Sequence, residues 1–154
     1  MKLTDKELLE YSKEHLCYEI WMLLEVGKIE NTFGQVFTNM VIESFVVHLR
    51  NLITFLYPTS SVHSTDISAK DFFINPDIWE SKRPSLSQIL ENARNRAHKE
   101  MGHLTTERIT GADDPKKAWN RSELINEIVP ILSLFCGSAD KNKLDESVSK
   151  LLNL

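Results

Sequence analysis

The longest apolar-rich run in the chain spans residues 37–57 and reads FTNMVIESFVVHLRNLITFLY. In an α-helix each residue advances about 100° around the axis. The apolar positions then fill roughly half of the circumference: Phe37, Val41, Ile42, Phe45, Val46, Leu49, Leu52, Ile53, Phe55 and Leu56. A stripe this broad faces more than one neighbour, so the run is predicted to be a central helix of a bundle.

The rest of the composition favours the same class. The chain has 154 residues, enough for one domain with a real core. It contains five Gly and five Pro, few for an all-β chain that needs many turns. We count four long helical segments, a short one and no convincing strand. The prediction is a single all-α domain over residues 1–154, an up-and-down bundle of four main helices plus short helices.

Helix starts are indicated by capping-box patterns, in which Ser, Thr or Asn is followed three residues later by Glu or Gln. Three such pairs occur: Thr4 with Glu7, Ser85 with Gln88, and Asn120 with Glu123. The first helix is expected to stop near Gly27 or Asn31, and the central helix at Pro58. The third should end between Arg108 and Gly111.

The sequence patterns of the remaining elements are weaker. Short helical turns are expected over residues 66–73 and 75–81, anchored by apolar and aromatic side chains: Phe72, Phe73, Ile78 and Trp79. Pro130 should kink the fourth helix or mark a new start, and Gly137 should end it. A short last helix is expected within residues 140–154, with Leu144, Val148, Leu151 and Leu152 facing inward.

Charge is distributed unevenly. The net charge is −4, which argues against a surface that binds nucleic acid throughout. Residues 82–108 carry six Lys or Arg against three Glu, a local +3. Residues 1–30 carry four Lys against seven Asp or Glu, a local −3. A protein polarised this way could bind an anion on one side or pair head-to-tail with itself.

The sequence also predicts a cytoplasmic protein that does not enter a membrane. Its charged first ten residues do not resemble a signal peptide, and Glu43, His48 and Arg50 make the central run a poor membrane span. Cys17 and Cys136 lie in apolar surroundings and are expected to be buried, reduced thiols, although a disulfide between them is also open.

The most suggestive chemistry is the pair Arg96 and His103. Seven residues apart on a helix, they share one face about 10 Å from each other, with Lys99 and Glu100 between them. A guanidinium can clamp a phosphate, and an imidazole can move a proton near neutral pH. Metal-independent RNA cleavage needs these two roles. The alternative is structural: a hydrogen-bonded histidine at a helix edge beside a solvated cationic face.

A metal site is not predicted. Glu100 and His103 form a Glu-x-x-His pair of the kind that helical di-iron proteins use, but such a site needs a second pair and two further carboxylates. No second Glu-x-x-His occurs in the chain. No cofactor motif is found either.

The central helix carries polar residues of its own. His48 falls in the apolar half and is expected to be a core histidine that donates to a buried carbonyl. Glu43 and Arg50 share the polar half, flanked by Asn51 and Thr54. If either charged group is buried it needs a counter-charge; Arg50 could instead reach an anion.

Three stretches together resemble HEPN-type small bacterial proteins, closest to the uncharacterised and abortive-infection branches. They are residues 43–52 (ESFVVHLRNL), a connection with Asp71, Phe72 and Trp79, and residues 99–108 (KEMGHLTTER). The resemblance implies a helical bundle, often dimeric, and in active members a metal-independent ribonuclease with an Arg, four to six residues, then His. Arg96 and His103 fit that spacing, while Ala97 stands where the family usually has a polar residue.

Two functions follow as hypotheses. In the first, an HEPN-like protein of a defence or toxin–antitoxin system binds or cleaves RNA. Arg96 and His103 are then catalytic, supported by four binding residues: Arg50, Asn51, Lys99 and Arg108. In the second, the chain is a non-enzymatic interaction module and these polar residues are structural, with Glu43 and His48. The partners expected are a second copy of the chain, RNA, and an antitoxin or other protein.

Overall fold

The computed structural model describes residues 3–30, 34–59, 65–101, 106 and 118–153. Within these ranges every regular element is a helix and no strand occurs, which confirms the all-α class. In chain order the elements are α1 (Asp5–Tyr11), the π-helical segment η1 (Ser12–Leu16), α2 (Cys17–Lys28), α3 (Gln35–Leu56), the 3-10 turn η2 (Ala69–Phe72), α4 (Pro76–Lys82), α5 (Gln88–Glu100), α6 (Arg121–Ser138) and α7 (Glu146–Leu151).

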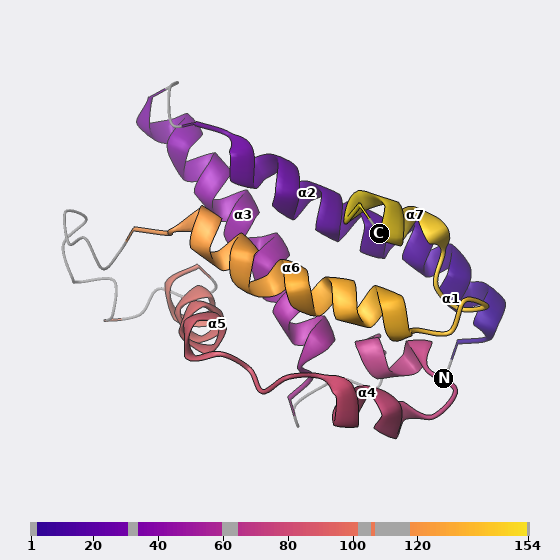
Figure 1. Ribbon diagram of the computed structural model, residues 1–154. Helices are drawn as coiled ribbons and strands as arrows, with labels where there is room; N and C mark the ends of the chain where they lie inside the picture. The colour runs from indigo at the N-terminus through magenta and orange to yellow at the C-terminus, as the bar shows by residue number, and fades with distance from the viewer. Residues whose placement is uncertain (1–2, 31–33, 60–64, 102–105, 107–117, 154) are drawn as a thin grey trace.

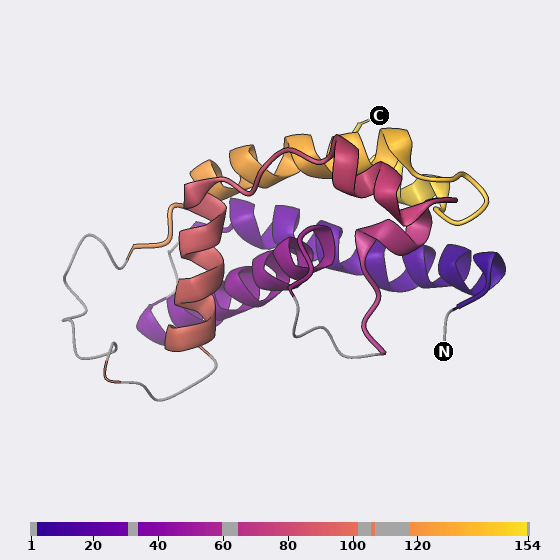
Figure 2. The same ribbon diagram turned by 90° about the horizontal axis from the view of Figure 1, so that it is seen from below.

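The long helices are not all parallel to one another. α1, η1 and α2 form one continuous rod, and α3 folds back along α2 in the opposite direction (Figure 1). α6 packs on this hairpin and α7 lies against α2. α5 is seen nearly end-on in Figure 1 and runs across α3 in Figure 2. The up-and-down order predicted from the sequence therefore describes α2 and α3 but not α5.

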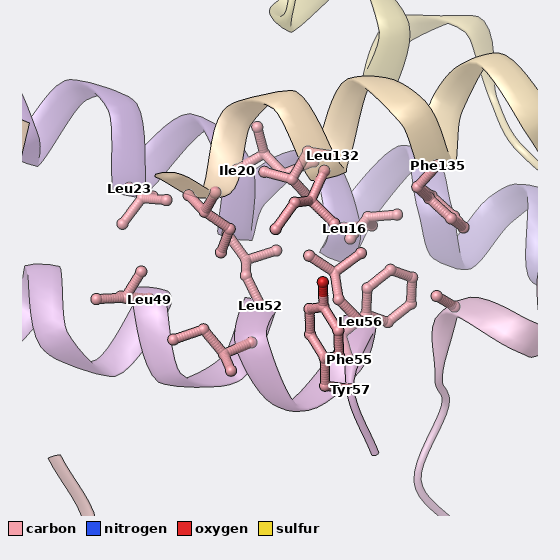
Figure 3. Close-up of a cluster of buried hydrophobic side chains, with 14 of the residues drawn as sticks. Leu16, Ile20, Leu23, Leu49, Leu52, Phe55, Leu56, Tyr57, Leu132 and Phe135 are labelled. Carbon is pink, nitrogen blue, oxygen red and sulfur yellow. The ribbon is translucent and has the colours of Figure 1, made fainter. Parts of the chain in front are cut away.

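α3 is the central helix that its periodicity predicted. Of the ten apolar positions named for it, eight are buried, and only Phe37 and Ile42 are half-buried. Leu49, Leu52 and Leu56 lie in one cluster with side chains of η1 and α2 and with Leu132 and Phe135 of α6 (Figure 3). The helices of the described ranges include none with the length and apolar character to cross a bilayer.

Two of the three predicted helix starts are confirmed. The Thr4 hydroxyl accepts from the Glu7 N–H at 3.3 Å, and the Glu7 carboxylate accepts from the Thr4 N–H at 2.7 Å. Asn120 accepts from the Glu123 N–H at 3.3 Å. Each cap satisfies a backbone donor that has no partner within the first helical turn.

The third start was placed two residues too early. α5 begins at Gln88, and its cap is Ser87, which accepts from the Leu90 N–H at 3.3 Å. Ser85 is not in the helix, because the Tyr57 hydroxyl donates to the Pro84 carbonyl at 2.9 Å and holds this stretch against the end of α3. The sequence offers two serines in succession, and only this tertiary contact selects the second.

The end of the same helix was also predicted wrongly. α5 stops at Glu100, where the Met101 N–H still donates to the Ala97 carbonyl at 3.1 Å. The residue after Met101 is Gly102, a type that commonly follows helix ends. Arg96 therefore lies in the last turns of α5, and this helix does not continue to the predicted end between residues 108 and 111.

The connection between α3 and α5 packs over the domain, as its aromatic residues indicated. Phe72, Phe73 and Trp79 are buried and form a cluster with Phe135, in which Trp79 and Phe135 stand edge to face at 5.7 Å between ring centres. Ile78, also named as an anchor, is instead 37% exposed. Because adjacent positions of α4 point to different sides, only Trp79 faces the core.

α6 passes through Pro130 without a new start. The helix runs continuously from Arg121 to Ser138, one residue beyond the predicted end at Gly137. Pro130 is exposed. Proline has no backbone N–H, so one carbonyl of the preceding turn loses its partner. On the solvent side this carbonyl is not buried, and the helix therefore tolerates the proline. Beyond it, Leu144 and Val148 are buried as expected, and Leu151 and Leu152 are half-buried.

The π-helical segment η1 was not predicted. The Cys17 N–H donates to the Ser12 carbonyl, five residues back. Ser12 is completely buried; its hydroxyl donates to the Leu9 carbonyl at 2.8 Å and accepts from the Asp145 N–H at 2.9 Å. The wider turn thus accompanies a serine that joins the first rod to the start of α7, a long-range contact without a local sequence signal.

Candidate functional site

The cations of residues 82–108 suggested an anion site on this side of the molecule, and two of them bind the end of α3 instead. Arg83 Nη1 donates to the Leu56 carbonyl at 3.2 Å, and Arg94 Nη1 donates to the Tyr57 carbonyl at 3.4 Å. Trp79 Nε1 donates to the same Leu56 carbonyl at 3.0 Å. Carbonyls at a helix C-terminus have no partner within the helix and carry its partial negative charge, so these donors stabilise α3.

Arg96, the predicted phosphate-binding residue, is engaged in the same way. Its Nε lies 3.0 Å from each carboxylate oxygen of Glu100, and Nη1 donates to the Ala118 carbonyl at 3.2 Å. The guanidinium carbon lies 4.1 Å from the centre of the Trp119 ring. The Arg96 and Glu100 side chains are only 22% and 21% exposed. The cluster Arg96–Glu100–Trp119 therefore joins the end of α5 to the start of α6.

The structure places the other predicted residues of this region as follows. Lys99 is exposed in the last turn of α5, next to the equally exposed His98. His103 and Arg108 lie outside the described residues, so the arrangement of the Arg96–His103 pair stays a prediction. Glu100 is not directed at a metal, because its carboxylate binds Arg96; the described part of the chain contains no group of three His, Cys, Asp or Glu that could hold one.

The polar residues of α3 form a second cluster, with a partner that sequence reasoning missed. His48 is buried, and its Nδ1 lies 2.8 Å from Glu19 Oε2 of α2. Asn51 Nδ2 donates to the same oxygen at 3.2 Å. The predicted partner of His48 was a backbone carbonyl, and the actual one is a carboxylate. Glu19 lies 29 residues away from His48 in sequence, so no local spacing could reveal it.

Arg50 stands at the edge of a polar groove of about 430 Å³ beside this cluster. Its polar walls come from three separate stretches of chain: Tyr11, Glu19, Arg50, Asn51, Thr54 and Asp66. Burial raises the pKa of the Tyr11 phenol, and the nearby Glu19 and Asp66 carboxylates raise this pKa further. Glu43, which the sequence grouped with Arg50, lies about two turns earlier in α3. It is exposed and does not need a buried counter-charge.

The two cysteines are free thiols. Cys17 Sγ lies 3.1 Å from the Ser147 hydroxyl of α7, and burial is the main reason that its pKa is raised. Burial raises the pKa of Cys136 to about 12. A thiol is nucleophilic only as the thiolate, so neither residue is prepared for nucleophilic chemistry near neutral pH.

α2 and α3 both carry large apolar side chains in contact with water. Tyr18 and Trp21 of α2 are 49% and 48% exposed, and their ring centres lie 6.5 Å apart. The Tyr18 ring meets His48 of α3 edge-on at 5.5 Å. Next to His48, α3 exposes a stripe of Val36, Met40 and Val47, which are 76%, 60% and 48% exposed. We call these five residues the hairpin face.

Comparison with protein-family models, with curated proteins and with solved structures finds no match. The HEPN-like resemblance therefore stays a prediction.

Proposed function

We propose that this protein is a helical interaction module without catalytic activity, and that its hairpin face binds another protein. The observation that carries the proposal is the position of Arg96. The residue expected to hold phosphate has Nε on Glu100, Nη1 on a backbone carbonyl and its flat face on Trp119. Each of these contacts stabilises the junction of α5 and α6.

Electrostatics favours the structural role. A phosphate near Arg96 would compete with the Glu100 carboxylate for the same Nε–H and would experience its negative charge at close range. Removing the guanidinium from a partly buried carboxylate costs more than the hydrogen bond alone, because the carboxylate then lacks its counter-charge. A catalytic arginine that must relocate in this way is a poor preorganised electrostatic catalyst.

The hairpin face supplies the other half of the proposal. Apolar side chains scattered singly over a surface are ordinary, but adjacent ones with polar neighbours are typical of protein-binding surfaces. Tyr and Trp, which reach 49% and 48% exposure here, are also the residue types that contribute most to protein interfaces.

A nuclease assay tests the proposal that the protein has no catalytic activity. Purified protein is incubated with single-stranded and hairpin RNAs in the presence of a chelator, next to a His103→Ala variant. The expected result is the same background with both proteins. RNA cleavage by the wild type that disappears in His103→Ala would show that the chain is a nuclease.

A second candidate function is an HEPN-like protein that binds or cleaves RNA, with an antitoxin or other protein as partner and a four-helix bundle as its fold. The specific observation in its favour is that Lys99 and His98 are exposed at the end of α5, directly before the stretch that carries His103 and Arg108. Arg50 and Asn51 are exposed as well, so either could contact an RNA backbone.

Salt dependence distinguishes this second function. If cations at the end of α5 contact RNA, the logarithm of the binding constant falls with the logarithm of salt concentration, and Lys99→Gln reduces the slope by about one. A matched control is Lys141→Gln, which changes an exposed lysine of the loop before α7. Equal slopes for both variants, or no RNA binding, would remove this function from consideration.

A further inference from the structure

The α3 part of the hairpin face is complementary to itself under a two-fold rotation, and we infer that its partner is a second copy of this chain, bound through antiparallel α3 helices with Val47 at the two-fold axis. This inference rests on the proposed function and adds the identity and geometry of the partner. It depends on where the exposed side chains of α3 lie around and along the helix.

Around the helix, the exposed and half-buried residues of α3 are arranged symmetrically about Val47. At about 100° per residue, Met40, Val36 and Thr54 fall within about 20° of Val47 and form a central ridge. Glu43 and Arg50 lie about 40–60° to one side of the ridge, and Ser44 and Asn51 lie about 40–60° to the other. The flanking residues are thus one charged pair and one neutral polar pair.

Along the helix, the same residues match in pairs. A two-fold axis at Val47 that reverses the helix direction brings each edge of α3 against the same edge of the second copy. With a rise of about 1.5 Å per residue, Glu43 lies about 6 Å before Val47, and Arg50 lies about 4.5 Å after it. Glu43 of one copy therefore stands almost level with Arg50 of the other, and the axis generates this ion pair twice.

The opposite edge is complementary as well. The same rotation places Ser44 beside Asn51 of the second copy, a pair that can exchange hydrogen bonds without burying charge. Neither edge brings like charges together. A face that pairs opposite charges on one side and neutral groups on the other, with valine in the middle, is complementary to itself, as an isologous interface requires.

The polar groove provides room for an exposed apolar side chain of the ridge. Met40 is 60% exposed and lies seven residues before Val47, while Thr54, which lines the groove, lies seven residues after it. The rotation therefore sets Met40 of one copy level with Thr54 of the other, at the opening of the 430 Å³ groove. Methionine is unbranched and flexible, so it adapts to an irregular recess of this kind.

Charge exchange in the full-length protein tests this geometry by sedimentation equilibrium. Glu43→Arg or Arg50→Glu alone places two pairs of like charges across the axis, and we expect either change to weaken self-association at least about tenfold. The double variant, Glu43→Arg with Arg50→Glu, restores both pairs and should return within about threefold of the wild type. Circular dichroism verifies that each variant is folded.

Lys141→Glu is the matched control, because it reverses an exposed charge in the loop before α7 and should leave association unchanged. The inference is overturned if the wild type stays monomeric up to millimolar concentration, if the single variants associate like the wild type, or if the double variant stays as weak as the singles. The nuclease assay tests the absence of catalysis, and sedimentation tests self-association. A failure of either claim can therefore be distinguished from a failure of the other.

Discussion

Two charged regions of this molecule, the segment around α5 and the exposed side of α3, differ in what their charges contact. Around α5, Arg83, Arg94 and Arg96 each bind a backbone carbonyl, and Arg96 also binds Glu100. On α3, Glu43 and Arg50 are exposed beside apolar residues that are themselves exposed. Cations of the positive segment are therefore bound to carbonyls within the fold, whereas the charges of Glu43 and Arg50 on the exposed side of α3 cancel each other.

The largest difference in stability is expected between two tryptophan substitutions, one in the core and one on the hairpin face. Trp79→Ala should destabilise the protein by about 3–5 kcal/mol, because it empties a buried ring site and removes a donor to the end of α3. Trp21→Ala, on the hairpin face, should change stability by less than about 1 kcal/mol. Urea unfolding followed by circular dichroism measures both. Similar losses for the two variants would mean that the hairpin face is part of the core.

The next largest effect is expected for the arginines. Arg96→Ala should cost about 2 kcal/mol, since it removes a charge-assisted pair, a carbonyl bond and a ring contact from a partly exposed site. Arg50→Ala should cost less than about 0.5 kcal/mol, because an exposed side chain is lost. Thermal unfolding at low protein concentration makes the comparison, and a larger loss for Arg50→Ala would reverse it.

A smaller and pH-dependent effect is expected at Asp145, the cap of α7. The hydroxyl and N–H of Ser147 donate to its carboxylate and hold the pKa below the ordinary value. A lowered pKa in the folded state means that the stabilisation is complete above the unfolded pKa of about 3.9 and is lost as pH falls below it. Asp145→Ala should therefore cost about 1 kcal/mol at pH 7 and less near pH 3.

Asp145→Asn is the control for that prediction, because asparagine caps a helix without a titrating group. Its stability relative to the alanine variant should not follow the same change with pH. A wild-type advantage over Asp145→Ala that stays constant from pH 7 to pH 3 would contradict the assignment of the carboxylate as the cap.

The smallest effect on stability is expected at the proposed axis. Val47→Asp should change the free energy of unfolding by less than about 0.5 kcal/mol at concentrations where the protein is monomeric, since the site is exposed and the two residues have similar helix propensity. Self-association should nevertheless be lost, because two carboxylates would meet at the axis. A destabilised monomer would show that Val47 packs within its own chain.

Local sequence patterns predicted the elements that depend on local physics. The apolar period of α3 identified the central helix, and Thr4 and Asn120 marked helix starts through bonds to residues three positions away. Contacts across the fold were not accessible in the same way. Ser87 rather than Ser85 became a cap because Tyr57 holds the preceding segment, and nothing near Arg96 in sequence indicates Trp119.

The candidate site was harder to predict than the fold for the same reason. Arg50 and Asn51 were placed on the polar half of α3, and both are exposed, but the carboxylate that Asn51 contacts, Glu19, belongs to another helix. Arg96 with Glu100 was visible as a spacing of four residues on a helix, which equally suits an ion pair and a reactive cluster. Only the geometry distinguishes the two.

The most direct measurement of the central claim, that Arg96 is bound within the fold, is a double-mutant cycle between Arg96→Ala and Glu100→Ala, read as free energies of unfolding. The predicted coupling energy is at least about 1 kcal/mol in favour of the pair, because the two side chains meet at 3.0 Å in a partly buried site. A coupling energy of zero, or an Arg96→Ala variant more stable than the wild type, would contradict the structural role and return Arg96 to the list of reactive residues.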